Sequence, residues 1–152
     1  VSAIGTALVN LVISIVPLII VMLVDRAPFY WSMLFLPISI LILAAFTLGF
    51  GLFISSRAVF FPDVGEMYQV LLTAWMYLTP IIYPESMIPE NSLPFFRINP
   101  MYWMVKMFRI PIVEGRFPIW QEILPALAWA VGILIVGWLY FTSKSEEYAY
   151  RV

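Results

Sequence analysis

Two carboxylates near the middle of the chain have the spacing of an acid–base pair. Asp63 and Glu66 are three residues apart, so they share one face if the segment is helical, and such a pair could transfer protons in an enzyme. Pro62 directly precedes them, however, and a proline followed by acids is typical of the first turn of a helix. The chain has no histidine and no cysteine, which removes the commonest general base and the thiolate metal ligands. We therefore expect a helix start here, and neither a catalytic residue nor a metal site in the chain.

A second set of polar side chains follows a predicted helix start at Asn99 and Pro100. Tyr102, Lys106 and Arg109 recur every three or four residues and form one polar edge of a helix whose other faces are apolar. Arginine can hold a phosphate through two parallel hydrogen bonds, and lysine can act as a point charge. Two interpretations stay open. The edge contacts an anionic substrate on its path, or its cations only reach for lipid headgroups.

Aromatic side chains make up 17% of the residues. Most aromatic residues of a membrane protein form belts at the two interfaces, and we assign most of these rings to that class. Trp75 and Tyr77 lie inside an apolar run and not at its ends. We therefore expect these two residues to line a substrate path.

These residues are embedded in long apolar runs. Hydrophobic residues make up 63% of the chain and charged residues 11%, whereas soluble domains have about 45–50% and about 25%. A transmembrane helix needs about 20 mainly apolar residues, and continuous runs favour helices over the alternating strands of a barrel. The sequence predicts an all-α membrane protein, a single transmembrane domain over residues 1–152, with four transmembrane helices at about residues 3–24, 30–54, 66–83 and 120–142.

The segment before the last predicted span, residues 85–119, contains several prolines and yet remains aromatic and apolar. We expect it to form short re-entrant or interfacial helices, and we expect a polar tail at residues 143–152. A net charge of −1 offers no electrostatic surface for nucleic acid. The chain lacks the glycine-rich phosphate-binding loop sequence, so we expect it to bind no nucleotide or other cofactor itself.

Four short segments occur in an order and spacing that resemble one family. They are residues 60–64 (FFPDV), 75–84 (WMYLTPIIYP), 98–100 (INP) and 108–109 (FR). In these segments the chain resembles the permease subunit of type-2 ABC exporters of polysaccharides, which handle O-antigen, capsular polysaccharide and teichoic acid. The family usually has an arginine directly before the aspartate that corresponds to Asp63. Here Pro62 occupies that place, and Arg57, about one helical turn earlier, is the candidate substitute.

The resemblance covers essentially the whole chain and implies the later part of a six-span permease. Val1 lies inside an apolar run, so we expect the chain to be the C-terminal part of a longer polypeptide. The resemblance implies that the link at residues 57–66, with Arg57, Asp63 and Glu66, and the tail are cytoplasmic. It places residues 85–121 outside, as gate helices that dip back into the membrane.

The resemblance also implies partners. Two copies of the permease would form a conduit for a lipid-linked glycan in the bacterial cytoplasmic (inner) membrane, and separate nucleotide-binding subunits would hydrolyse ATP with Mg²⁺. An exporter of the same architecture for drugs or small lipids is the first alternative. A membrane enzyme acting on lipid-linked sugars is the less favoured one.

Overall fold

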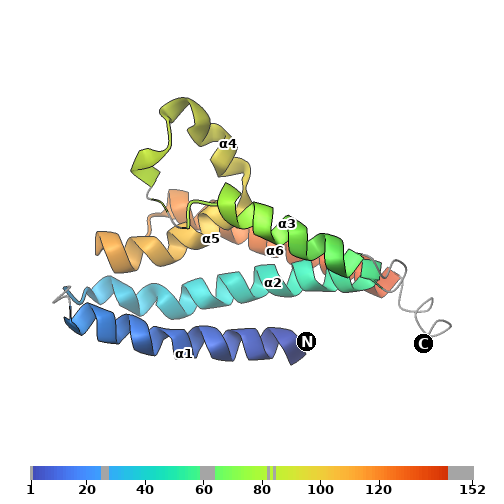
Figure 1. Ribbon diagram of the computed structural model, residues 1–152, viewed down its shortest axis with the longest axis horizontal. Helices are drawn as coiled ribbons and strands as arrows, with labels where there is room; N and C mark the ends of the chain where they lie inside the picture. Colours follow the sequence, from blue (N-terminus) through green and yellow to red (C-terminus); the bar gives the residue numbers. More distant parts are fainter. Residues whose placement is uncertain (1, 25–27, 59–63, 82, 84, 144–152) are drawn as a thin grey trace.

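The computed structural model describes residues 2–24, 28–58, 64–81, 83 and 85–143, and every regular element among them is helical (Figure 1). The all-α expectation is therefore confirmed for the described part of the chain. The elements in chain order are α1 (Ser2–Val24), the 3-10 helix η1 (Trp31–Phe35), α2 (Leu36–Ala58), α3 (Val64–Leu78), the 3-10 helices η2 (Glu85–Met87) and η3 (Glu90–Ser92), α4 (Leu93–Ile98), α5 (Pro100–Arg109), the π-helical turn η4 (Ile110–Glu114) and α6 (Trp120–Ser143).

Among the described residues, two helical segments are long and apolar enough to cross a membrane, Trp31–Arg57 and Trp120–Ser143. They match two of the four predicted spans. The α3 helix has 15 residues, which is shorter than the length that a crossing helix needs. Spans at residues 3–24 and 66–83 therefore remain predictions.

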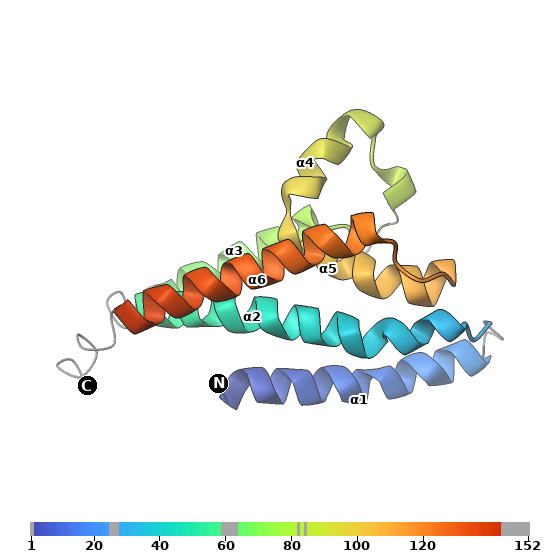
Figure 2. The same ribbon diagram turned by 180° about the vertical axis from the view of Figure 1, so that it is seen from behind.

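The two long helices α2 and α6 pack along each other, and glycine permits their closest approach (Figure 2). A Cβ atom added to Gly137 of α6 would lie 2.0 Å from the carbonyl oxygen of Gly49 in α2, and one added to Gly49 would lie 2.4 Å from the Cα of Leu134. Small residues let helix backbones approach closely where lipid supplies no hydrophobic drive for association. This crossing fixes the centre of the bundle.

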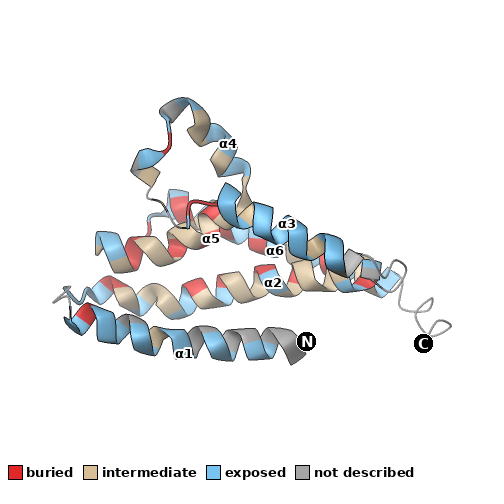
Figure 3. Ribbon diagram, in the orientation of Figure 1, coloured by how far each residue is buried: buried red, intermediate tan, exposed pale blue. Residues whose placement is uncertain are grey.

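The short helix α5 completes the core by packing against both α2 and α6. Its inward side chains are buried, with Met104 at 1% and Met107 at 0% exposure, and Ile110, the first residue of η4, is also at 0%. The buried cluster draws on all three helices and consists of Ile42, Phe46, Met104, Met107, Ile110, Ala126 and Ala130. By contrast, α1 and α3 lie at the surface with most of their described residues exposed (Figure 3).

Two serines bind the backbone where α5 passes into the π-helical turn. Pro111 has no N–H, so the carbonyl of Met107 loses the partner that it would have in a regular α-helix. The Ser39 hydroxyl donates to that carbonyl at 2.9 Å, and the Ser32 hydroxyl donates to the carbonyl of Pro111 at 2.9 Å. Both serines are buried, so these bonds satisfy backbone groups that water does not reach.

Candidate functional site

The polar edge predicted from the sequence exists, and it begins with the helix cap. Asn99 caps α5 through its side chain, which accepts a hydrogen bond from the backbone N–H of Met101 at 3.0 Å, and Pro100 occupies the first turn. This confirms the predicted helix start. Tyr102, Lys106 and Arg109 follow along the same edge, and each of these side chains binds the segment between the end of α3 and η2.

Asn99 joins α3 to α5 through every polar atom of its amide. The Oδ1 atom that caps α5 also accepts from the indole N–H of Trp75 at 2.8 Å. The Nδ2 group donates to the hydroxyl of Thr79 at 3.0 Å and to the carbonyl of Leu78 at 3.4 Å. An amide has two donor hydrogens and two acceptor lone pairs, so this side chain is fully satisfied by its neighbours.

The Thr79 hydroxyl beside Asn99 binds a backbone carbonyl at the end of α3, where Pro80 interrupts the helical hydrogen bonds. Pro80 cannot donate to the carbonyl of Met76, and the backbone N–H of Thr79 approaches that carbonyl instead, at 3.4 Å. The carbonyl of Trp75 receives the Thr79 hydroxyl at 2.8 Å. Thr79 is 1% exposed, so its hydroxyl closes the helix end in a place closed to solvent.

Arg109 binds the same helix end from the other end of α5. Its Nη2 donates to the carbonyl of Pro80 at 2.9 Å and to that of Tyr83 at 3.3 Å. A cation beside the free carbonyls that follow a helix is favourable for both hydrogen bonding and charge. The Arg109 side chain therefore acts as a clamp on the turn that follows α3.

A buried phenol and an amine hold the next segment through Glu85. The hydroxyl of Tyr102, 2% exposed, donates to one carboxylate oxygen of Glu85, and the Lys106 ammonium lies 3.3 Å from the other. Burial, together with the bond to Glu85, raises the pKa of Tyr102, so the phenol keeps its proton. Burial alone would lower the pKa of Lys106, but the neighbouring Tyr102 and Glu85 raise it overall, so the amine keeps its charge.

Lys106 also connects this contact to the start of α6. Its ammonium lies 3.9 Å from Glu122, which receives two parallel hydrogen bonds from Arg116, at 2.7 and 2.9 Å, and one from the backbone N–H of Ile119 at 3.0 Å. Arg116 also reaches Glu114 at 2.8 Å. Its hydrogen bonds to Glu122 raise the pKa of Arg116.

The sequence interpretation missed these acidic members of the network. The signal that was available is Glu122 itself, an acid in the first turn of a long apolar helix. Glu85 lies in a proline-rich segment with no clear periodicity, so its partners could not be read from the sequence.

The remaining predicted residues lie elsewhere. Tyr77 is 66% exposed on α3. Glu66 is exposed in the first turn of that helix, and the guanidinium of Arg57 lies over the ring of Tyr140 at 5.1 Å, which joins the ends of α2 and α6 away from α5 (Figure 1). Asp63 lies outside the described residues. The structure thus joins Trp75, through Asn99, to the helix that carries Tyr102, Lys106 and Arg109. Among the described residues, no hydrogen bond or ion pair connects the side chains of Tyr77, Arg57 and Glu66 to those three residues.

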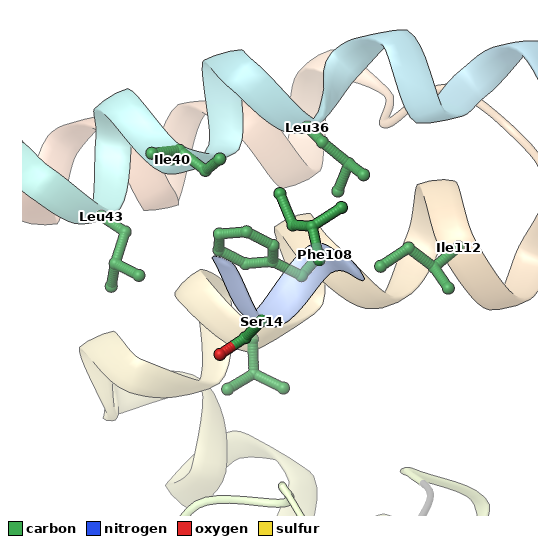
Figure 4. Close-up of a pocket in the computed structure, with 8 residues that line it drawn as sticks. Ser14, Leu36, Ile40, Leu43, Phe108 and Ile112 are labelled. Atoms are coloured by element: carbon green, nitrogen blue, oxygen red, sulfur yellow. The ribbon is translucent and has the colours of Figure 1, made fainter. Parts of the chain in front are cut away.

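An apolar groove lies on another face of α5, where α1, α2, α5 and η4 meet (Figure 4). It has a volume of about 320 Å³, and its walls include Ile40, Phe108 and Ile112. The hydroxyl of Ser14, which also lines it, donates to the carbonyl of Asn10 at 2.8 Å. Such a surface suits hydrocarbon. Among the described residues no group of three or more acidic side chains is arranged to hold a metal ion.

Comparison with known proteins identifies the family. The family described as ABC-2 type transporter matches residues 1–113. The chain is 30% identical over 152 residues to the O-antigen export system permease protein RfbA of Myxococcus xanthus, covering 97% of this chain and 58% of the relative. It is 30% identical over 70 residues to the O-antigen export system permease protein RfbA of Klebsiella pneumoniae, covering 46% of this chain and 27% of the relative.

The chain therefore spans 58% of the length of the Myxococcus protein. No solved structure matches it. The family match covers well over half of the chain and includes α1, α2, α3 and the whole polar edge of α5. The chain belongs to the ABC-2 type transporter family of membrane proteins.

Proposed function

We propose that this chain is part of the transmembrane subunit of an ATP-driven exporter that moves lipid-linked polysaccharide across the cytoplasmic membrane. The observation that carries the proposal is the similarity to O-antigen export permeases, which extends over 97% of the chain for the Myxococcus protein. The long apolar helices support a place in the membrane. The cargo can be O-antigen, capsular polysaccharide or teichoic acid.

Energy comes from a partner in this proposal. The sequence contains no phosphate-binding loop, which a nucleotide-hydrolysing subunit of this kind needs. A separate nucleotide-binding subunit supplies ATP hydrolysis with Mg²⁺, and two permease copies form the conduit. The support for this arrangement is membership of the ABC-2 family.

The proposed topology has four spans and a gate segment outside. In it the spans lie at about residues 3–24, 30–54, 66–83 and 120–142 of a multi-pass protein of the bacterial inner membrane. Residues 85–119 form the gate on the extracytoplasmic side, and the tail at 143–152 is cytoplasmic. The short helices η2, η3, α4 and α5, placed between α3 and α6, support a compact gate in this segment.

The residues of the path divide into two roles under this proposal. Tyr77 is largely exposed, so its ring is free to contact sugar. Trp75, Tyr102, Lys106 and Arg109 form the frame of the gate, because their polar groups hold the end of α3 and the following segment.

At the opposite end, Arg57, Asp63 and Glu66 brace the cytoplasmic link between α2 and α3. The ring contacts of Arg57 with Phe53 and Tyr140, at 5.7 and 5.1 Å, support this role.

The test is deletion of the gene that encodes the chain, followed by complementation with the full-length gene. We expect surface polysaccharide to disappear and lipid-linked glycan to accumulate on the cytoplasmic side, with both effects reversed by the intact gene. Complementation with Tyr77→Ala should reduce export, whereas Val70→Ala, a change at another exposed position of α3, should not. Normal surface polysaccharide in the deletion strain, with altered drug susceptibility, would instead support the exporter of drugs or small lipids.

A further inference from the structure

The α3 helix is attached to the rest of the protein along one narrow stripe. Among the side chains of α3 that the structure describes, Tyr68 and Trp75, seven residues apart, are partly buried, and Thr79, just after the helix, is buried one turn further on. The rest of its described surface is exposed, including Val70 at 72% and Leu71 at 62% (Figure 3). The position of this helix therefore depends on few contacts.

The contacts in the middle of α3 are aromatic. Phe50 of α2 meets Tyr68 at a ring-centroid distance of 6.0 Å and Trp75 at 5.4 Å, in tilted and edge-on arrangements. Aromatic pairs are favourable over a range of offsets and angles. These rings hold α3 beside α2, but they do not set its direction.

The hydrogen bonds at the C-terminal end of α3 are directional, and three of those that join it to α5 meet at Asn99. This one amide accepts from the Trp75 indole and donates to the Thr79 hydroxyl and the Leu78 carbonyl. Asn99 is itself fixed by its bond to the backbone N–H of Met101, and α5 is packed into the buried core with α2 and α6. Asn99 is therefore anchored in the core through α5, and its side chain holds α3 to that core.

We propose that Asn99 is the positioning residue of α3. Its amide sets the direction in which α3 leaves the core formed by α2, α5 and α6, while the contacts with Phe50 allow the rest of the helix to tilt. Loss of the Asn99 donor bonds frees the direction of α3 without unfolding α5. This inference goes beyond the proposed transport function, because it concerns how one helix is held, whatever the cargo.

The test measures distances between spin labels in the full-length protein in membranes. This chain contains no cysteine, so labels are placed at chosen sites after any cysteine elsewhere in the full-length protein has been replaced. The reporting pair joins α3 to α6 through Thr73→Cys and Val131→Cys, both exposed positions. A second pair, Leu41→Cys with Val131→Cys, reports the spacing of α2 and α6. Labelled protein is diluted with unlabelled protein so that distances are measured within one chain.

Substitutions at Asn99 and at Thr79 separate an effect on the direction of α3 from an effect on the stability of α5. Asn99→Asp keeps the oxygen that caps α5 but removes the donor to Thr79, and Thr79→Val removes the hydroxyl that Asn99 binds, whereas Thr79→Ser keeps it. The matched control is Tyr83→Phe, which removes a hydrogen bond of 3.3 Å to the carbonyl of Tyr77 at the same helix end without touching Asn99.

We expect Asn99→Asp and Thr79→Val to shift and broaden the distribution of distances between α3 and α6. Thr79→Ser and Tyr83→Phe should reproduce the parent distribution, and the pair on α2 and α6 should not change in any variant. An unchanged distribution in Asn99→Asp and Thr79→Val overturns the proposal, and so does equal broadening in Tyr83→Phe. If Asn99→Asp also changes the distances between α2 and α6, the test rests on the two variants of Thr79. A broader distribution of distances between α3 and α6 in Thr79→Val than in Thr79→Ser then supports the proposal, and equal distributions overturn it.

Discussion

At the scale of single residues, Arg109 shows why the type of cation matters. One terminal nitrogen of its guanidinium reaches two carbonyls, those of Pro80 and Tyr83. A lysine ammonium has enough N–H donors for two carbonyls, but it stands on a shorter side chain and does not reach the position of this nitrogen. We expect Arg109→Lys to lower the free energy of unfolding by about 1 kcal/mol, the net contribution of a typical hydrogen bond. Thermal unfolding of the purified full-length protein measures this.

The matched control for Arg109 is Arg97→Lys, at an exposed position of α4. That change should leave the unfolding temperature as it is in the parent protein. Equal effects of the two substitutions would show that the carbonyl clamp contributes nothing to stability.

A second prediction concerns the carboxylates around Arg116. The side chain of Glu122 is 10% exposed and receives a bidentate pair of bonds, whereas the side chain of Glu114 is 40% exposed. Exposed ion pairs contribute little to stability, and bidentate pairs with a shielded carboxylate contribute more. Glu122→Gln should therefore destabilise the protein by about 1 kcal/mol more than Glu114→Gln does. Chemical denaturation of the two variants provides the comparison, and a larger loss in Glu114→Gln would contradict the prediction.

The sequence located the polar edge of α5 but not its partners. The spacing of Tyr102, Lys106 and Arg109 is a local property, set by the helical repeat, and it was sufficient to place them on one edge. Their binding to Glu85 and to the carbonyls after α3 depends on how the helix is rotated and on where a proline-rich segment returns. Local periodicity contains no such information.

At the scale of elements, the contact between α2 and α6 depends on the absence of side chains. A methyl group on Gly137 would meet backbone atoms of Gly49 and not a flexible side chain, so the helices must separate to admit it. We expect Gly137→Ala to cost about 1–3 kcal/mol, as overpacking typically does, and to reduce the amount of folded protein recovered from membranes.

Gly132 provides the control on the same helix, because a Cβ atom added there meets nothing within 4 Å. Gly132→Ala should leave the yield and the unfolding temperature at least as high as in the parent protein. A loss in Gly132→Ala equal to that in Gly137→Ala would contradict the prediction, because alanine favours a helix over glycine and the loss would then not depend on the crossing.

The boundaries of helices could be predicted where they depend on residues close together in the sequence. Asn99 and Pro100 marked the start of α5, and two of the predicted spans match the long apolar helices of the structure to within three residues. The crossing at Gly49 and Gly137 could not be predicted, because a single sequence does not show which glycines face one another. The π-helical turn at Ile110–Glu114 was also missed, since it depends on donors from Ser32 and Ser39 far away in the chain.

At the scale of the whole molecule, the proposed topology puts η4 and the C-terminal tail on opposite sides of the membrane. Single cysteines at Glu114 and at Glu146 test it, in a full-length protein without other cysteines. We expect the cysteine at Glu114 to react with an impermeant thiol reagent in spheroplasts, and the one at Glu146 to react only after lysis. The reverse pattern would contradict the orientation and weaken the proposed export function.

The two serine bonds beneath α5 also fix the register of this helix on its neighbour. Ser32 and Ser39 are placed to meet the carbonyls of Pro111 and Met107 together. If α5 slid along α2 by one turn, both carbonyls would lose their donors in a region closed to water, and each would be left unsatisfied at a cost of about 1–3 kcal/mol. Sliding is therefore the costly motion for this helix. The bonds from Ser32 and Ser39 therefore hold α5 and the turn after it in one register on the α2 side, as a single stiff unit.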